Sequence, residues 1–142
     1  MSTEINIEDL IPHRDRMKLL DEVVKTTSDE AVTRTTISGR WPLVREDGNN
    51  GPCVDPVVFI EIVAQTAAVQ VSARTRQNAA DRRGWMVGIK KADFFTDLVP
   101  VYTVLTTRVR CLQSIDNYDV LEGEVSSGQG LLCRIEIQVF RE

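Results

Sequence analysis

A carboxylate inside an apolar stretch is the first feature of this sequence that could do chemistry. Glu61 lies within residues 57–71, which are mostly apolar, and Gln65 follows four positions later. Residues four apart on a helix share one face, so the two side chains would form a polar stripe on an apolar cylinder. A carboxylate in such surroundings needs an explanation, because burying an unpaired charge is costly. It is either a functional acid or base, or a structural acid held by hydrogen bonds.

His13 and Cys53 are the other side chains with chemical potential. His13 is the only histidine, so any imidazole acid or base must be this residue; alternatively its side chain fixes a turn. Cys53 lies just before the apolar stretch, where a helix dipole would stabilise a thiolate. No base is paired with it in the sequence, so simple packing is the alternative for Cys53. For Gln65 the alternative to a binding role is satisfaction of a buried hydrogen bond.

These residues need a helix to position them, and the sequence predicts where it begins. Asp55 suits the N-cap, and Pro56 suits the first helical position, where a missing N–H has no cost. The apolar pattern runs to about Arg76 and covers nearly every side of the helix. We therefore expect one long helix buried by its surroundings.

The rest of the chain predicts a mainly antiparallel sheet around this helix, which is an α+β arrangement. The last strand shows the clearest signal, since apolar and polar residues alternate from Leu131 to Phe140. Turn-forming residues fill Gly39 to Gly51, which we expect to be a long loop. The other expected strands are Met17 to Val24, Ala31 to Ile37, Trp85 to Phe94, Val101 to Cys111 and Tyr118 to Ser126.

Composition indicates one domain over residues 1–142 and narrows its setting. The chain is 42% apolar and 27% charged, and its net charge of -4 argues against a general nucleic-acid binder. No signal peptide pattern is seen at its start, and we expect no apolar run near the roughly 20 residues of a membrane span. The three cysteines, Cys53, Cys111 and Cys133, form no CxxC motif, so we expect neither a disulfide framework nor a metal site. We expect a reducing cytoplasm as the setting, and no cofactor.

Three motifs, in order along almost the whole chain, resemble the hot-dog 3-hydroxyacyl-[acyl-carrier-protein] dehydratases. Residues 11–23, IPHRDRMKLLDEV, are similar to the family's L-P-H-R-x-x-x-x-L-x-D-x-V. Residues 60–65, IEIVAQ, are similar to I-E-x-M-A-Q, and residues 87–94, VGIKKADF, followed by Val99-Pro100, to G-I-x-x-A-x-F and V-x-P-G-D. The resemblance implies a hot-dog fold, a homodimer or higher homo-oligomer, and an acyl carrier protein or coenzyme A thioester as ligand.

The resemblance also implies a catalytic pair, of which one member is missing. In that family an acid on the central helix works with a histidine 14 positions earlier, as general acid and base. Glu61 takes the acidic position, but position 47 is Asp47. Pro56 replaces a glycine whose N–H polarises the thioester carbonyl, and proline has no N–H to donate. A diverged branch, resembling aryl-polyene dehydratases, shares the PHxxxM-type opening, which keeps His13 with Glu61 as a relocated catalytic pair.

The predicted function is a dehydratase-like protein acting on acyl thioesters in fatty-acid or polyene-type biosynthesis. A non-catalytic acyl-thioester-binding or dimer-partner subunit is the alternative, as is an acyl thioesterase using Asp47 or Asp55. We expect the substrate to contact Gln65, Val57 and Cys53. Basic residues near the helix exit either dock the acidic carrier protein or form an ordinary solvated surface: Arg82, Arg83, Lys90 and Lys91.

Overall fold

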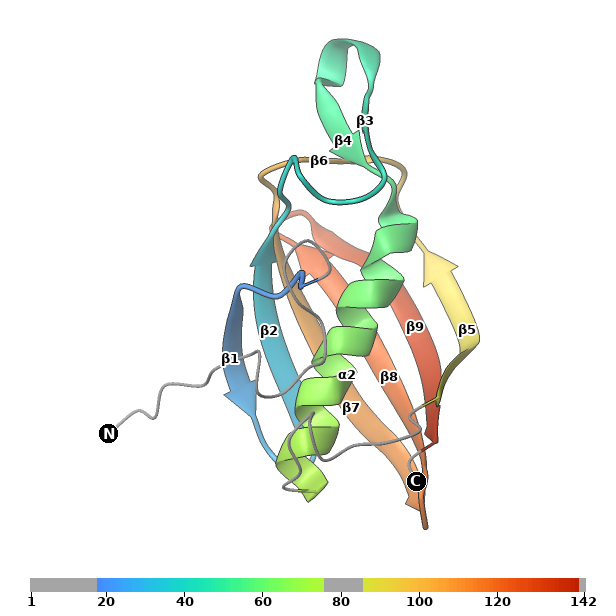
Figure 1. The fold of residues 1–142 in the computed structure, drawn as a ribbon. Coiled ribbons are helices and arrows are strands. Elements are labelled where there is room, and N and C mark those ends of the chain that lie inside the picture. The colour runs from blue at the N-terminus through green and yellow to red at the C-terminus, as the bar shows by residue number, and fades with distance from the viewer. Residues whose placement is uncertain (1–17, 76–85, 141–142) are drawn as a thin grey trace, which may run out of the picture.

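The computed structural model describes residues 18–75 and 86–140, and shows a six-stranded sheet curled around one long helix (Figure 1). Every strand pair is antiparallel, in the order β1-β2-β7-β8-β9-β5. The predicted α+β architecture is thus confirmed. The strands of this sheet are β1 (Glu22–Thr26), β2 (Glu30–Thr36), β5 (Met86–Phe94), β7 (Val104–Ile115), β8 (Tyr118–Ser127) and β9 (Gly130–Phe140).

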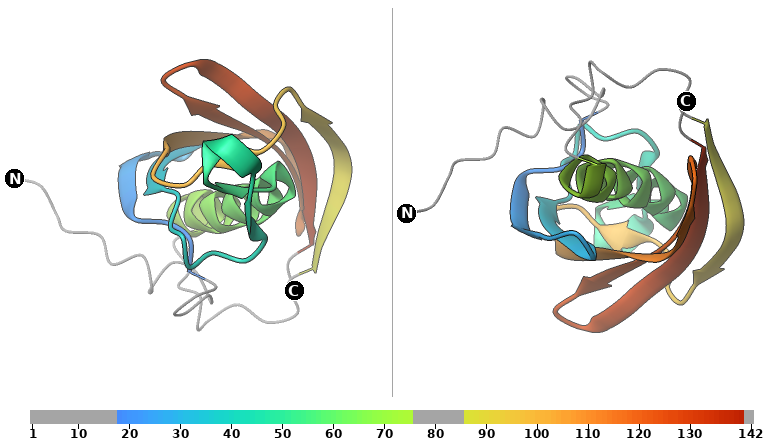
Figure 2. Two further views of the ribbon diagram at one scale, coloured as in Figure 1. Left: turned by 90° about the horizontal axis from the view of Figure 1, so that it is seen from above. Right: turned by 90° about the horizontal axis from the view of Figure 1, so that it is seen from below.

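The inner face of the sheet forms the core against the helix. Alternate residues of the long strands are fully buried, as period-2 patterning requires: Leu105, Val109, Leu121, Val125, Cys133, Ile135, Ile137 and Val139. The outer face places opposite charges across from one another, as in Arg110 and Glu122, whose side chains lie 2.8 Å apart. The views along the helix show it lying within the concave side of the sheet (Figure 2).

The helix begins where the sequence predicts. Asp55 is the N-cap, and its Oδ1 accepts a hydrogen bond from the Val57 N–H at 3.0 Å. The first turn, Pro56–Val58, is a 3-10 helix, and the α-helix α2 follows as Phe59–Thr75. The far end of α2 is held to the sheet by an ion pair, in which Arg74 Nη2 lies 2.6 Å from Asp119 Oδ2.

The expectation that no apolar run approaches the length of a membrane span was wrong. Residues Pro56–Arg74 have the length and hydropathy of such a span. Of that window 72% is buried inside the fold, as the core helix of a folded domain requires.

The expectation of a long loop at residues 39–51 was also wrong, because this segment contains part of a small second sheet. Strand β3 (Val44–Glu46) pairs with β4 (Pro52–Val54), which pairs with β6 (Val99–Pro100). A 3-10 turn, η2 (Gly48–Asn50), joins β3 to β4, and the hairpin extends beyond the body of the fold (Figure 1). Gly51 adopts a positive φ of 71° at this turn, which glycine does at little cost.

Candidate functional site

Glu61 and Gln65 lie on one face of α2, as predicted. Glu61 is in the first turn of this helix and is partly buried, whereas Gln65 is completely buried. The Gln65 Nε2 donates a hydrogen bond to Glu61 Oε1 at 3.4 Å. The structure therefore places a carboxylate and a polar neighbour together near the start of the buried helix.

The Gln65 side chain also contacts the segment that leads into β1. The Leu19 N–H donates to Gln65 Oε1 at 2.9 Å, across 46 positions of sequence. Leu19 and Leu20 are buried and belong to the main core. His13 lies six positions before Leu19, outside the described residues, so its approach to Glu61 stays a prediction.

The helix start offers few backbone donors for a thioester carbonyl. Pro56 has no N–H, and the Val57 N–H is bonded to the Asp55 side chain. The Val58 N–H donates to the Asp55 carbonyl oxygen at 3.2 Å. These bonds leave the start of the helix without the open pair of donors that oxyanion stabilisation needs.

Val57 and Cys53, both predicted to contact substrate, lie in different surroundings. The Val57 side chain is 45% exposed at the start of the helix, so a ligand can reach it. Cys53 is in β4 and buried, and burial, reinforced by the charges of Asp47 and Glu46, raises the pKa of its thiol. A thiol in these surroundings is a poor nucleophile, which favours the packing role for Cys53.

Asp47 occupies the place where the resemblance expects a histidine. It lies in the β3–β4 hairpin, is half-buried, and its N–H donates to the Gly51 carbonyl oxygen at 2.9 Å. The structure thus has a carboxylate in the loop before the helix. A carboxylate cannot replace an imidazole as a donor unless it is protonated.

The predicted carrier-docking residues are only partly described. Lys90 and Lys91 lie exposed on β5, 3.6 Å from Glu136 and Asp93, respectively. Arg82 and Arg83 fall outside the described residues. Within residues 18–75 and 86–140, no group of three or more His, Cys, Asp or Glu side chains lies close enough to hold a metal ion.

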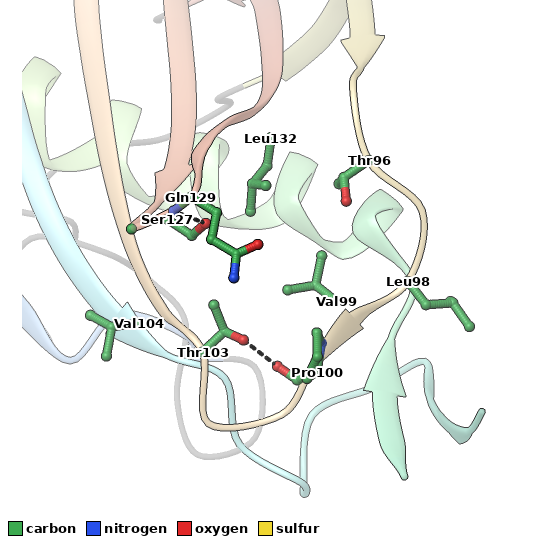
Figure 3. Close-up of a pocket in the computed structure, with 10 residues that line it drawn as sticks. Thr96, Leu98, Val99, Pro100, Thr103, Val104, Ser127, Gln129 and Leu132 are labelled. Atoms are coloured by element: carbon green, nitrogen blue, oxygen red, sulfur yellow. Dashed lines mark hydrogen bonds between the residues drawn. The ribbon is translucent and has the colours of Figure 1, made fainter. Parts of the chain in front are cut away.

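The sequence did not predict the hollow shown in Figure 3, whose volume is about 420 Å³. It lies between the β8–β9 turn and the chain that runs from β5 through β6 to β7. Within this hollow Thr103 Oγ1 donates to the Pro100 carbonyl oxygen at 2.7 Å. None of the predicted site residues that the structure describes lines it. The lining side chains include Thr96, Leu98, Val99, Gln129 and Leu132.

Comparisons with known proteins agree with this geometry. The 3-hydroxyacyl-[acyl-carrier-protein] dehydratase FabZ of Xanthomonas euvesicatoria is 26% identical over 133 residues, covering 92% of this chain and 87% of that protein. The bifunctional enzyme LpxC/FabZ of Chlorobaculum tepidum is 23% identical over 91% of this chain, which spans only 29% of that enzyme. The dehydratase heterocomplex ApeI:P of Xenorhabdus doucetiae superposes with a TM-score of 0.82 at 19% identity, covering 99% of this chain and 93% of that one.

The fold defines a hot-dog protein, with a carboxylate in the first turn of its central helix. The model of one family, ApeP-like, described as ApeP dehydratase, matches residues 5–142. The chain therefore belongs to the ApeP-like dehydratase family, and the resemblance to hot-dog dehydratases is confirmed.

Proposed function

We propose that this chain takes part in the dehydration of 3-hydroxyacyl thioesters on acyl carrier protein, in biosynthesis of the aryl-polyene type. The observation that carries the proposal is the Glu61 carboxylate, partly buried and hydrogen-bonded in the first turn of the core helix. Membership of the ApeP-like dehydratase family supports it. The name of the FabZ relative supports the carrier-bound 3-hydroxyacyl substrate.

Glu61 would serve as the general acid or base of this reaction. A base removes a proton from the carbon next to the thioester carbonyl, and the C–H electron pair becomes part of the new double bond. An acid protonates the hydroxyl group on the next carbon, and this group leaves as water. We propose His13 as the second group, since it is the only imidazole in the chain.

A second subunit fits this proposal. Among the described residues, strand β5, nine residues long, pairs on one side only and is an edge of the six-stranded sheet. An edge strand can pair with a strand of another subunit. The ApeI:P neighbour is named as a dehydratase heterocomplex. This name supports a partner subunit that differs from this chain, as an alternative to the homodimer predicted from the sequence. A cytoplasmic location remains a prediction.

One observation favours a non-catalytic role as the second candidate. Asp47 stands in place of the loop histidine, and the Val57 N–H beside Pro56 is already bonded to Asp55. A chain with these losses can retain an acyl-binding surface and leave the chemistry to a partner. Hydrolysis by a carboxylate and water is the third candidate.

Mass spectrometry of a carrier-bound 3-hydroxyacyl chain separates these candidates. The chain is incubated with the thioester, alone and together with a second hot-dog dehydratase subunit. Loss of one water that the Glu61→Gln substitution abolishes supports the proposal, whereas water loss that needs the second subunit and survives this substitution supports the non-catalytic role. Release of a free acid would make the protein a thioesterase, and an unchanged substrate in both incubations would leave only the binding role.

A further inference from the structure

We propose that Gln65 is a positioning residue that orients the Glu61 carboxylate by holding its Oε1. The inference rests on the proposed function, in which Glu61 transfers the proton. Gln65 is completely buried, and its amide contacts Glu61 on one side and Leu19 on the other. The amide therefore joins the carboxylate to the segment that enters β1.

The chemistry of the two partners fixes the direction of this amide. The Leu19 backbone N–H can only donate, so the atom facing it at 2.9 Å must be the Gln65 oxygen. The amide nitrogen is then turned to Glu61, where it can only donate to the carboxylate. If the amide were rotated by half a turn, its nitrogen would face the Leu19 N–H, donor against donor, and its oxygen would face the Glu61 carboxylate, acceptor against acceptor.

Such a contact selects one rotation of the carboxylate. The last torsion of a glutamate side chain is broad, so the carboxylate plane is poorly defined without a partner. A donor at a fixed place restricts it, and proton transfer depends on this alignment. The 3.4 Å separation is long, and catalytic hydrogen bonds often shorten only when substrate is bound.

Gln70 is a matched control on the same helix. It is also completely buried, and its Nε2 donates to the Ser28 carbonyl oxygen at 3.0 Å. Its position is nine residues after Glu61. Replacing either glutamine by methionine removes one buried amide and the hydrogen bond of one backbone group, the Leu19 N–H or the Ser28 carbonyl, so Gln70→Met controls for this structural part of the loss.

Steady-state kinetics of Gln65→Met and Gln70→Met tests the proposal. We expect Gln65→Met to lower kcat on the order of 10- to 100-fold and to change KM by less than about 2-fold, as misalignment of a reacting group does. Gln70→Met should keep the wild-type kcat. Equal kcat values in the two variants would overturn the proposal. If Gln65→Met does not fold, Gln65→Glu retains the shape and an oxygen for Leu19, and it should lower kcat in the same way.

A measurement without turnover separates this inference from the proposed function. The side-chain amide signals of Gln65 and Gln70 are followed by nuclear magnetic resonance in the wild type and in Glu61→Ala. We expect the Gln65 signals to shift and those of Gln70 to stay in place. A shift at Gln65 in a chain that dehydrates no thioester would refute the proposed function but retain the contact. Unmoved Gln65 signals would overturn the positioning role itself.

Discussion

Buried neutral side chains of the core helix have individual hydrogen-bond partners, and Glu61 differs from them in its charge and its exposure. Thr66 Oγ1 lies 2.8 Å from Thr33 Oγ1, and Gln70 donates to the Ser28 carbonyl oxygen. These neutral groups are completely buried, and each makes a side-chain hydrogen bond, although the Gln70 Oε1 has no partner among the described residues. Glu61 is ionisable and only partly buried. Burial thus distinguishes the neutral residues Thr66 and Gln70 from Glu61, the residue of α2 that we place in catalysis.

Cys133 gives a residue-scale prediction on pH. Burial raises the pKa of the Cys133 thiol to about 12, against an ordinary value of 9.0. Above pH 9.0 the unfolded chain ionises at Cys133 while the folded chain does not. The free energy of unfolding should therefore fall as the pH rises from 9.0 toward 12, by up to about 1.4 kcal/mol per pH unit from this group.

Denaturant unfolding of the wild type and of Cys133→Ala, below and above pH 9.0, measures this contribution. The variant should be less stable at neutral pH, because it leaves a cavity, and should lose less stability at alkaline pH. The same alkaline slope in both proteins would show that Cys133 is accessible to water in the folded chain.

At the scale of elements, helix α2 packs closely on strand β8 at Gly123. A Cβ added at this glycine would overlap both γ-methyl groups of Val63, which is completely buried on α2. Valine is stiff at χ1, so its methyl groups cannot easily move aside. A glycine in the middle of a strand is explained here by close packing of the helix.

Gly123→Ala should therefore lower the free energy of unfolding by about 1–3 kcal/mol, as overpacking of a core does. Thermal or denaturant unfolding measures the change. Gly128→Ala is the control, since a Cβ there would meet nothing within 4 Å. Adding Val63→Ala to Gly123→Ala should relieve part of the overlap, so the two changes should not be additive. A Gly123→Ala variant as stable as Gly128→Ala would contradict this packing.

Elements with local signals were predictable from the sequence, and those that depend on distant partners were not. Asp55 and Pro56 mark the helix start because capping is a local interaction. The three-residue strands β3 and β4 have too few residues for a period-2 pattern. Strand β4 also pairs with β6, where Val54 lies opposite Val99, 45 positions later in the sequence. The β3–β4 hairpin was missed for this reason.

At the scale of the whole molecule, the contacts of the candidate site also fall into two groups, those that local spacing predicts and those that depend on distant segments. Glu61 and Gln65 were predictable as neighbours, since helical spacing alone brings them together. The contact of Gln65 with Leu19 depends on how the chain enters β1, which no local pattern specifies. The hollow between the β8–β9 turn and the segment from β5 to β7 likewise depends on residues far apart in the sequence (Figure 3).

The fold holds the Glu61 carboxylate in the first turn of its buried helix, and our central claim is that this carboxylate transfers a proton. The most direct test is the rate of water loss from a carrier-bound 3-hydroxyacyl chain, compared between the wild type and Glu61→Gln, with retained secondary structure verified by circular dichroism. Glutamine keeps the shape and can still hydrogen-bond but cannot take up a proton. We predict that Glu61→Gln lowers turnover by roughly 100-fold or more. A folded variant that dehydrates the substrate as fast as the wild type would contradict the account.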